Sequence, residues 1–489
     1  MTSKTMIGAL SAILLAGAAF QEPASAATQE KSAVVADQVQ YSLNGTAVKP
    51  ALPAVNVEGS LFLPVRAFGQ LLNKYVDWDA ATQSVLLTDK PELIGKYELN
   101  APDLADGIKM SVGSSLTHLP GDPDNVFYST ADRGPNGEVP VDGEVRRTFP
   151  LSSYTPSIYK IQVDKGEIKI LETIPLKVNG VDPVSQTANI TGLSNVASRD
   201  EKPYDKEAKT LLSYDPYGLD IEGIAYNAKD DTFWISEEYG PSIVQVKRDG
   251  TIIQRIVPAG MKELLDSPAV PLVDTIPAAY LNRRSNRGME AVGITPDGKW
   301  MFAAMQSPLR NPDKKTDNSR VLRILKFDLS TLKPVAEYAY VSEDAGQFQK
   351  LAQADIVISD LIAVNETTLL VDERDKNAGE AAQLKRIYLT DLSEATNVLG
   401  KYDDAQAADK TLEQMSMDEL AQQSIRFPAK RTVLDAVEFG FPFEKIEGIS
   451  LVNGNVLSIL NDNDFGVAGD VGPGNGTLLW QFKLPYSIK

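Results

Sequence analysis

Cysteine is missing from this sequence, and histidine occurs once, at His118. Without cysteine the chain cannot form disulfides, thiol nucleophiles or thiolate metal sites. A single histidine excludes a multi-histidine zinc or copper centre, because both metals favour imidazole and thiolate over carboxylate. Hard cations that prefer oxygen ligands, Ca²⁺ above all, are therefore the metals that suit this chain.

Long apolar segments are also missing. The longest run, residues 7–20, is too short to cross a bilayer as a helix. It lies between Lys4 and the small-residue pattern Ala24-Ser25-Ala26, an order typical of a secretory signal peptide with its cleavage site. We therefore predict a signal peptide over residues 1–26 and a secreted or cell-surface, extracellular protein whose mature chain has no membrane span.

Acidic residues outnumber basic ones, 66 Asp and Glu against 48 Lys and Arg, and the net charge is −18. A surface of this sign repels a phosphate backbone, so nucleic acid is not expected as a partner. Two interpretations of the carboxylates stay open, a plain solvated surface and binding sites for cations. The length of 489 residues suggests two or three domains.

The segment 35–89 has the pattern of a small α+β module. Its predicted elements are a hairpin at Asn44-Gly45, a strand over 61–63, a helix over 67–73 and a hairpin over 76–88. Four of its motifs resemble the copper amine oxidase N-terminal domain, namely Asn44-Gly45, Leu63-Pro64-Val65-Arg66, Val76-Asp77-Trp78-Asp79 and Ser84-Val85-Leu86-Leu87. Copper amine oxidase activity does not follow, because the copper needs several histidines. The resemblance implies an accessory domain that attaches the protein to the cell wall or surface.

A repeat runs through the rest of the chain, residues 94–489. Three clear copies begin at Asp220-Ile221-Glu222-Gly223, Gly288-Met289-Glu290-Ala291 and Lys445-Ile446-Glu447-Gly448. Each continues with a tight turn and a second strand that ends in polar residues. Two weaker copies begin near Ser114 and Ser359, which makes five.

The interval between Glu222 and Glu290 predicts one blade of a β-propeller. It has room for strands at 222–228, 232–238, 242–247 and 251–257, followed by a long loop. Four antiparallel strands per repeat are typical of a propeller blade. We therefore predict a mainly β fold, a five- or six-bladed β-propeller behind a small N-terminal α+β module. The last copy has three strands, so a strand near 95–99 is expected to close the ring.

Repeated carboxylates are the candidate site. The first strand of each blade lines the central channel, so the equivalent residues Glu222, Glu290 and Glu447 are expected to converge there. Further carboxylates fall near the end of the next strand, namely Glu237, Glu238, Asp372, Glu373, Asp462 and Asp464. Carboxylates brought together repel one another unless a cation joins them. The alternative is that each Glu-Gly pair is a blade signature whose carboxylate bonds neighbouring backbone amides.

The motifs as a set resemble the phytase-like, or "esterase-like activity of phytase", family. They are Asp132-Arg133-Gly134-Pro135, Glu222-Gly223-Ile224-Ala225, Trp234 to Glu238, Met289 to Val292, Val371 to Arg374, Glu447 to Ile449 and Asn461 to Phe465. The family is similar in architecture to propeller phytases, which hydrolyse phosphomonoesters with calcium held by axial carboxylates. The metal ligands this implies are Asp132, Glu222, Glu237, Glu238, Glu290, Asp372, Glu373, Glu447, Asp462 and Asp464. The catalytic residues it implies are Glu222, Glu290, Glu447, Arg133, Arg287 and Arg374.

In this scheme the arginines and Lys445 hold the phosphate, although each has an alternative role as the partner of a nearby carboxylate. Three functions remain open: a secreted calcium-dependent phosphoester hydrolase, a hydrolase of carboxylic esters or lactones on the same propeller, and a non-catalytic cell-surface binding protein. The sequence has no Gly-x-Ser-x-Gly motif, which disfavours a serine esterase.

Overall fold

The computed structural model describes residues 33–36, 38–50, 52–79, 83–105, 107–467 and 476–489. The predicted signal peptide, residues 1–26, lies outside this range. The chain divides into two compact units, Met1–Leu71 and Leu72–Lys489. No helix in the described part of the chain is long and apolar enough to cross a membrane.

The first unit contains short strands and one helix. β1 (Ala33–Ala36), β4 (Ala54–Val57) and β5 (Ser60–Phe62) form an antiparallel sheet, and α1 (Val65–Leu71) follows. β2 (Tyr41–Leu43) and β3 (Thr46–Val48) form the predicted hairpin. Its turn places Asn44 and Gly45 at positive φ, 53° and 84°, which explains the choice of these two residue types.

The hairpin of β6 (Lys74–Asp79) and β7 (Ser84–Asp89) belongs to the second unit. It lies against β30 (Ala429–Asp435), where the backbone N–H and the hydroxyl of Thr432 donate to Asp77 at 2.9 Å and 2.7 Å. The backbone N–H of Asp435 donates to the Tyr75 hydroxyl at 2.9 Å. The predicted module, 35–89, therefore contributes to both units.

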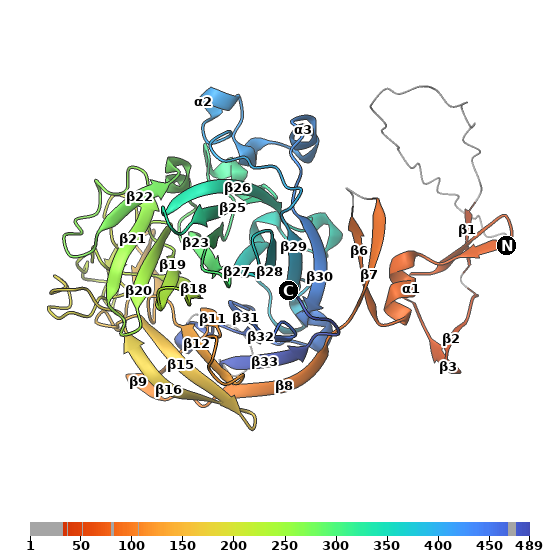
Figure 1. The fold of residues 1–489 in the computed structure, drawn as a ribbon, viewed down its shortest axis with the longest axis horizontal. Helices are drawn as coiled ribbons and strands as arrows, with labels where there is room; N and C mark the ends of the chain where they lie inside the picture. The colour runs from red at the N-terminus through yellow and green to blue at the C-terminus, as the bar shows by residue number, and fades with distance from the viewer. Residues whose placement is uncertain (1–32, 37, 51, 80–82, 106, 468–475) are drawn as a thin grey trace. The chain divides into compact units, whose positions relative to one another are not determined.

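The second unit is a five-bladed β-propeller with four antiparallel strands in each blade (Figure 1). Blade 1 consists of β11 (Ser115–Thr117), β12 (Val126–Thr130), β15 (Ser157–Asp164) and β16 (Glu167–Pro175). Blade 2 consists of β18 (Ile221–Asn227), β19 (Thr232–Glu237), β20 (Ser242–Lys247) and β21 (Ile252–Pro258). Blade 3 consists of β23 (Met289–Ile294), β24 (Trp300–Met305), β25 (Val321–Asp328) and β26 (Lys333–Val341).

Blade 4 consists of β27 (Val357–Ala363), β28 (Thr368–Arg374), β29 (Lys385–Asp391) and β30. Blade 5 consists of β31 (Gly448–Val452), β32 (Val456–Leu460), β33 (Leu478–Lys483) and β8 (Glu92–Leu99). The pairing of β8 with β33 confirms the predicted closing strand. β8 also pairs in parallel with β16, so blades 5 and 1 form one eight-stranded sheet. The predicted mainly β propeller is confirmed, and the blade count is five.

Shorter elements connect or decorate the blades. The strands are β9 (Asp103–Ala105), β10 (Ile108–Lys109), β13 (Gly137–Val141), β14 (Glu144–Thr148), β17 (Pro203–Tyr204) and β22 (Leu272–Ile276). The α-helices are α2 (Ala405–Ala408) and α3 (Met417–Gln422). The 3-10 helices are η1 (Ala278–Asn282), η2 (Lys314–Asn318), η3 (Ala345–Gln347), η4 (Gln353–Asp355), η5 (Gly379–Ala381), η6 (Leu412–Gln414), η7 (Ala436–Phe439) and η8 (Asp464–Gly466).

The inner strands β11, β18, β23, β27 and β31 form the centre of the ring (Figure 1). They approach closely, and the glycine of the Glu-Gly motif is the reason they can. A Cβ on Gly223 would lie 2.9 Å from the Glu290 carbonyl oxygen, and one on Gly448 would lie 2.8 Å from the Ser115 carbonyl carbon. Each glycine thus allows the backbone of the next inner strand to pack against its own.

Five apolar clusters hold neighbouring blades together, one at each boundary around the ring. At the boundary of blades 1 and 2, for example, the rings of Tyr128 and Phe233 lie 5.2 Å apart and both side chains are buried. Burial at these boundaries is the main stabilising contribution to the ring. It leaves the ends of the inner strands available for polar residues.

Candidate functional site

The predicted site residues lie at one end of the propeller. Inner strands begin at this end and second strands finish there, because the two are antiparallel. Glu222 and Glu290 are the second residues of β18 and β23, and Glu447 directly precedes β31. The same topology places Glu238 and Asp462 just beyond the ends of β19 and β32.

A β-bulge sets the direction of these side chains. The pairing register shifts at Glu222 in blade 2, at Glu290 in blade 3 and at Ser359 in blade 4. A bulge inserts one residue that has no partner across the ladder and turns its side chain out of the alternating pattern. Glu222 and Glu290 therefore occupy a specialised backbone position, whereas Glu447 precedes its strand.

Asp220, Glu222 and Glu238 form what we call the Glu222 cluster. One carboxylate oxygen from each residue lies within 4.8 Å of the others. Asp220 and Glu238 are buried, whereas Glu222 is partly exposed, so the cluster reaches solvent through Glu222. Among the described residues Glu222 has no hydrogen bond or ion pair. Within the described ranges the Asp220 Oδ2 atom has no hydrogen-bond partner, although Arg133 Nη1 lies 3.1 Å from it.

The electrostatics of this cluster favour a bound cation. Burial, followed by the charge of Glu290, raises the pKa of Glu222 well above its ordinary value. Burial, followed by the charge of Asp220, raises the pKa of Glu238 to about 8. The pKa of Glu290 is raised by burial and then by the charge of Glu447. Glu290 and Glu447 thus extend the negative field of the cluster, and a cation would relieve the repulsion.

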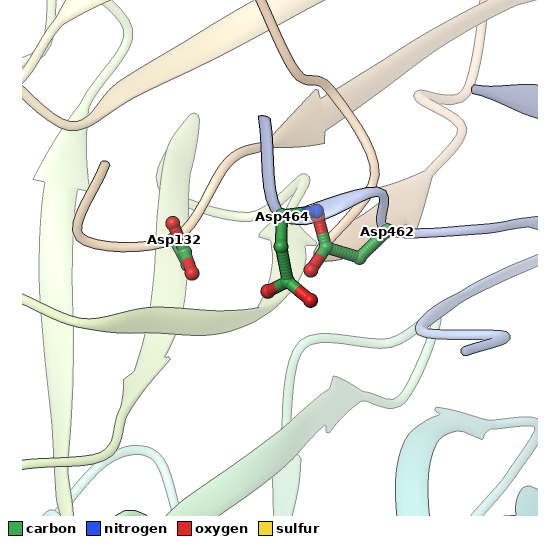
Figure 2. Close-up of side chains that lie close together, drawn as sticks. All are labelled: Asp132, Asp462 and Asp464. Atoms are coloured by element: carbon green, nitrogen blue, oxygen red, sulfur yellow. The ribbon is translucent and has the colours of Figure 1, made fainter. Parts of the chain in front are cut away.

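A second group, the Asp464 cluster, comprises Asp132, Asp462 and Asp464. Their carboxylate oxygens also lie within 4.8 Å of one another (Figure 2). Lys445 Nζ donates to Asp462 at 3.1 Å and to Asp464 at 2.8 Å. The backbone N–H of Gly134 donates to Asp132 at 2.9 Å. The chain therefore supplies its own cation to this cluster.

Two of the three predicted phosphate-binding arginines are already paired. Arg133 Nη1 lies 3.2 Å from Glu201 and 3.1 Å from Asp220. Arg374 donates to Glu447 at 2.6 Å and to the Ser359 hydroxyl at 2.7 Å. These guanidinium groups hold carboxylates of the site in place. The Arg287 guanidinium has no such partner among the described residues.

Five predicted metal ligands belong to neither cluster: Glu290 and Glu447, whose charges act on the Glu222 cluster, and Glu237, Asp372 and Glu373. Glu237 forms a buried ion pair with Arg255 at 2.5 Å, because consecutive strand residues face opposite sides and its neighbour Glu238 faces the cluster. Glu373 accepts hydrogen bonds from the Tyr340 hydroxyl at 2.7 Å and from Lys430 at 2.9 Å. Asp372 is buried, neither of its carboxylate oxygens has a hydrogen-bond partner in the described part of the chain, and burial raises its pKa.

Sequence reasoning missed several members of the site. Asp220 stands two residues before Glu222 in the repeated motif, so this position could have been found. Gln306 donates to the Glu290 carboxylate, and Asp360 accepts from the backbone N–H of Ile449 at 2.8 Å, which joins blades 4 and 5. These two contacts join different strands or blades, and no local sequence pattern predicts them.

The fold and these carboxylates define the main body as a five-bladed β-propeller with an acidic end. The family model described as "Esterase-like activity of phytase" matches residues 114–465, and the chain belongs to this phytase-like family. A second model, described as the copper amine oxidase N-terminal domain, matches residues 27–94. Both matches confirm the resemblances drawn from the motifs.

Among curated proteins, an "Uncharacterized secreted protein" of Arthroderma benhamiae is 30% identical over 184 residues. The match covers 34% of this chain and 36% of that protein, so the chain spans about a third of this relative.

Two solved structures cover most of the chain at low similarity. A putative oxidoreductase (glucose dehydrogenase) of Thermus thermophilus is 11% identical with a TM-score of 0.31, covering 83% of this chain and 95% of its own. A luciferin-regenerating enzyme is 8% identical with a TM-score of 0.30, covering 85% of each chain. These scores support no conclusion about function.

Proposed function

We propose that the protein is a secreted, divalent-cation-dependent hydrolase of ester bonds, with phosphomonoesters as substrates and the Glu222 cluster as its site. The observation that carries this proposal is the set of three carboxylates within 4.8 Å, in which Glu222 and the Asp220 Oδ2 atom have no hydrogen-bond partner among the described residues. The family description names an esterase-like activity, and the Arthroderma relative is described as secreted.

The donor set fits Ca²⁺ better than a softer metal. Every donor is a carboxylate oxygen, the ligand type that Ca²⁺ prefers, and the partly exposed Glu222 leaves a side open for water or substrate. Asp220, Glu222 and Glu238 would hold the cation. Bound there, it would offset the charge of a phosphoester and of the transition state.

Other residues of the chain would supply a general base and hold the carboxylates of the site in position. Glu290 Oε2 is buried with no hydrogen-bond partner among the residues that the structure describes, so it can accept a hydrogen bond from water and take its proton as a general base. Gln306 donates to the other carboxylate oxygen and fixes the orientation of the side chain. The Arg374 guanidinium fixes Glu447 in the same way, and the backbone N–H of Arg133 donates to Asp220.

The test uses the full chain and p-nitrophenyl phosphate. We expect turnover that persists with a zinc-selective chelator, stops when calcium is stripped and returns when Ca²⁺ is added. Glu222→Gln should lose both Ca²⁺ binding, measured by calorimetry, and turnover. Glu172→Gln, which changes an exposed carboxylate on β16, is the matched control and should keep both. No turnover on a broad panel of phosphate and carboxylic esters would overturn the proposal.

A carboxylic ester or lactone is the second candidate substrate, favoured by the family description alone. The same carboxylates would serve it, since a cation and a general base also promote acyl-ester hydrolysis. Turnover of p-nitrophenyl acetate without turnover of p-nitrophenyl phosphate by one preparation would decide for this candidate.

A further inference from the structure

The Arg133 guanidinium approaches the Glu222 cluster but is shared between two carboxylates. Its Nη1 atom donates a hydrogen bond to Glu201 Oε2 at 3.2 Å. The same nitrogen lies 3.1 Å from Asp220 Oδ2, yet this oxygen has no hydrogen-bond partner in the ranges that the structure describes. Because the two distances are nearly equal, the direction of the N–H group decides which carboxylate receives the hydrogen bond.

A second contact fixes the orientation of this guanidinium. The side-chain oxygen of Asn286 accepts a hydrogen bond from Arg133 Nη2. A guanidinium is planar and its N–H groups point in fixed directions, so contacts at both terminal nitrogens determine how it lies. The Arg133 side chain is only 4% exposed, which gives solvent little access to these positions.

Glu201 is held in place by contacts of its own. It lies two residues before β17, which pairs in parallel with β14 and so places Arg147 opposite Pro203. Arg147 donates to both carboxylate oxygens of Glu201, at 3.1 Å from Nε and at 3.0 Å from Nη2. The preceding residue, Asp200, forms a buried ion pair with Arg283 at 2.9 Å. A carboxylate that accepts two hydrogen bonds from one guanidinium has a fixed orientation.

Glu201 also carries a charge in the folded protein. Burial opposes ionisation of its carboxyl group, but the charges of Arg133 and then Arg147 outweigh burial and lower its pKa. An ionised Glu201 competes with Asp220 for Arg133, since charged acceptors form the stronger hydrogen bonds with a guanidinium. In the Asp464 cluster, by contrast, Lys445 donates to two of the three carboxylates.

We propose that Glu201 is a positioning residue, which turns the Arg133 guanidinium away from Asp220 Oδ2 and keeps this oxygen free for the cation of the Glu222 cluster. Without the charge of Glu201, the N–H groups of Arg133 would turn to Asp220, because a buried guanidinium needs an acceptor. The chain would then occupy the oxygen that a cation from solution needs. The part in cation binding rests on the proposed function, whereas the orientation of Arg133 does not.

Calorimetry with Ca²⁺ on the full chain tests this role. Glu201→Gln removes the charge and keeps the size of the side chain, and we expect about a tenfold or greater loss of Ca²⁺ affinity. Glu138→Gln is the matched control, because Glu138 pairs with Arg147 at 2.7 Å but, among the described residues, makes no ion pair with Arg133. It should keep the affinity within about twofold. Equal losses in the two variants would overturn the proposal.

A second background separates positioning from a general effect of charge. In Arg133→Gln, the guanidinium that would block Asp220 is gone, so adding Glu201→Gln should change Ca²⁺ affinity by less than about twofold. An additional loss of about tenfold in that background would overturn the proposal. Thermal unfolding checks that each variant is folded. If Glu201→Gln does not fold, Asn286→Gly takes its place, since it frees Arg133 Nη2 and glycine suits the positive φ of this residue. Lower Ca²⁺ affinity in Asn286→Gly would then support the proposal, and unchanged affinity would overturn it.

A crystal structure of the calcium-stripped Glu201→Gln variant separates this inference from the hydrolase proposal. A hydrogen bond from Arg133 Nη1 to Asp220 Oδ2 in that structure supports the positioning role even if no ester is hydrolysed. An unchanged guanidinium, with Asp220 Oδ2 still without a donor, overturns the role even if Ca²⁺-dependent turnover is found.

Discussion

The Glu222 and Asp464 clusters each bring three carboxylates together, yet their charges are balanced differently. In the Asp464 cluster, Lys445 lies within 3.1 Å of two of the three carboxylates. In the Glu222 cluster, the partly exposed Glu222 has no partner among the described residues, and Arg133 approaches only Asp220. A buried carboxylate needs a counter-charge in either case. In the first cluster the lysine reaches two carboxylates, whereas in the second the cation of the chain, Arg133, pairs with Asp220 alone; we propose that a cation from solution completes the second cluster.

Replacing Lys445 should have the largest effect. Lys445→Gln leaves Asp462 and Asp464 without their cation, and breaking such a pair costs about 3 kcal/mol, the low end of the usual range because Lys445 is 22% exposed. In chelator we expect this variant to have a lower thermal midpoint than the original chain, and added Ca²⁺ should restore it. The Asp464 cluster of the original chain should not respond to Ca²⁺ in this way. A loss of stability that Ca²⁺ does not restore would show that the two clusters differ in more than their cation.

Removing one carboxylate from the Glu222 cluster should affect turnover rather than folding. Asp220→Asn should lower kcat/KM for a phosphomonoester by about 100-fold, or ~2.7 kcal/mol, as lost transition-state stabilisation. Asp462→Asn is the matched change in the other cluster and should stay within about threefold of the original activity. Equal losses in steady-state assays of the two variants would remove the distinction between the clusters.

The calcium-stripped protein should lose stability as pH rises. Glu238 has its pKa raised from 4.5 to about 8, so between these values the folded state binds more protons than the unfolded state. The free energy of unfolding then falls with pH, by ~1.4 kcal/mol per unit for this one group. The stabilising contribution is complete below pH 4.5 and is lost as pH passes 8. Thermal midpoints should decline over this range in chelator and flatten with Ca²⁺; a rise in chelator would show that Glu238 does not control the trend.

The smallest effect is expected at Asp132. Burial, followed by the charge of Asp462, raises its pKa well above the ordinary value, so the ionised form is disfavoured at this position. Asp132→Asn keeps the shape of the side chain and removes the charge that burial disfavours, so the free energy of unfolding should change by less than about 1 kcal/mol. A chemical denaturation series measures this, and a loss of several kcal/mol would mean that Asp132 is charged in the folded protein.

Much of the propeller could be predicted from its repeats. The strands predicted for blade 2 coincide closely with β18 to β21, and the repeated Glu-Gly pairs lie on inner strands as expected. The direction of the glutamates could not be predicted in the same way, because it depends on bulges that the sequence does not mark. Simple alternation was enough to separate Glu238 from Glu237, but only once the strand boundaries were known.

The roles of the basic residues follow from the sequence less well than those of the acidic residues. Arg133, Arg287 and Arg374 stand beside acidic motifs and look alike in the sequence. Their roles differ because Asp220 reaches Arg133 across 87 positions and Glu447 reaches Arg374 across 73. The contact between Asp77 and Thr432 spans 355 positions and could not be predicted from the sequence either. Such pairings form only when the ring closes, so a short stretch of sequence does not predict them.

The pairing of β8 with β33 has a consequence for how the chain reaches its final form. Residues 92–99 cannot find their place until residues 478–483 are available, so the last blade assembles through contacts of the highest sequence separation in the ring. Steps of this kind are slow, since a long loop must close before any pairing stabilises it. Closure of the ring between β8 and β33 is therefore the step expected to limit the rate of folding.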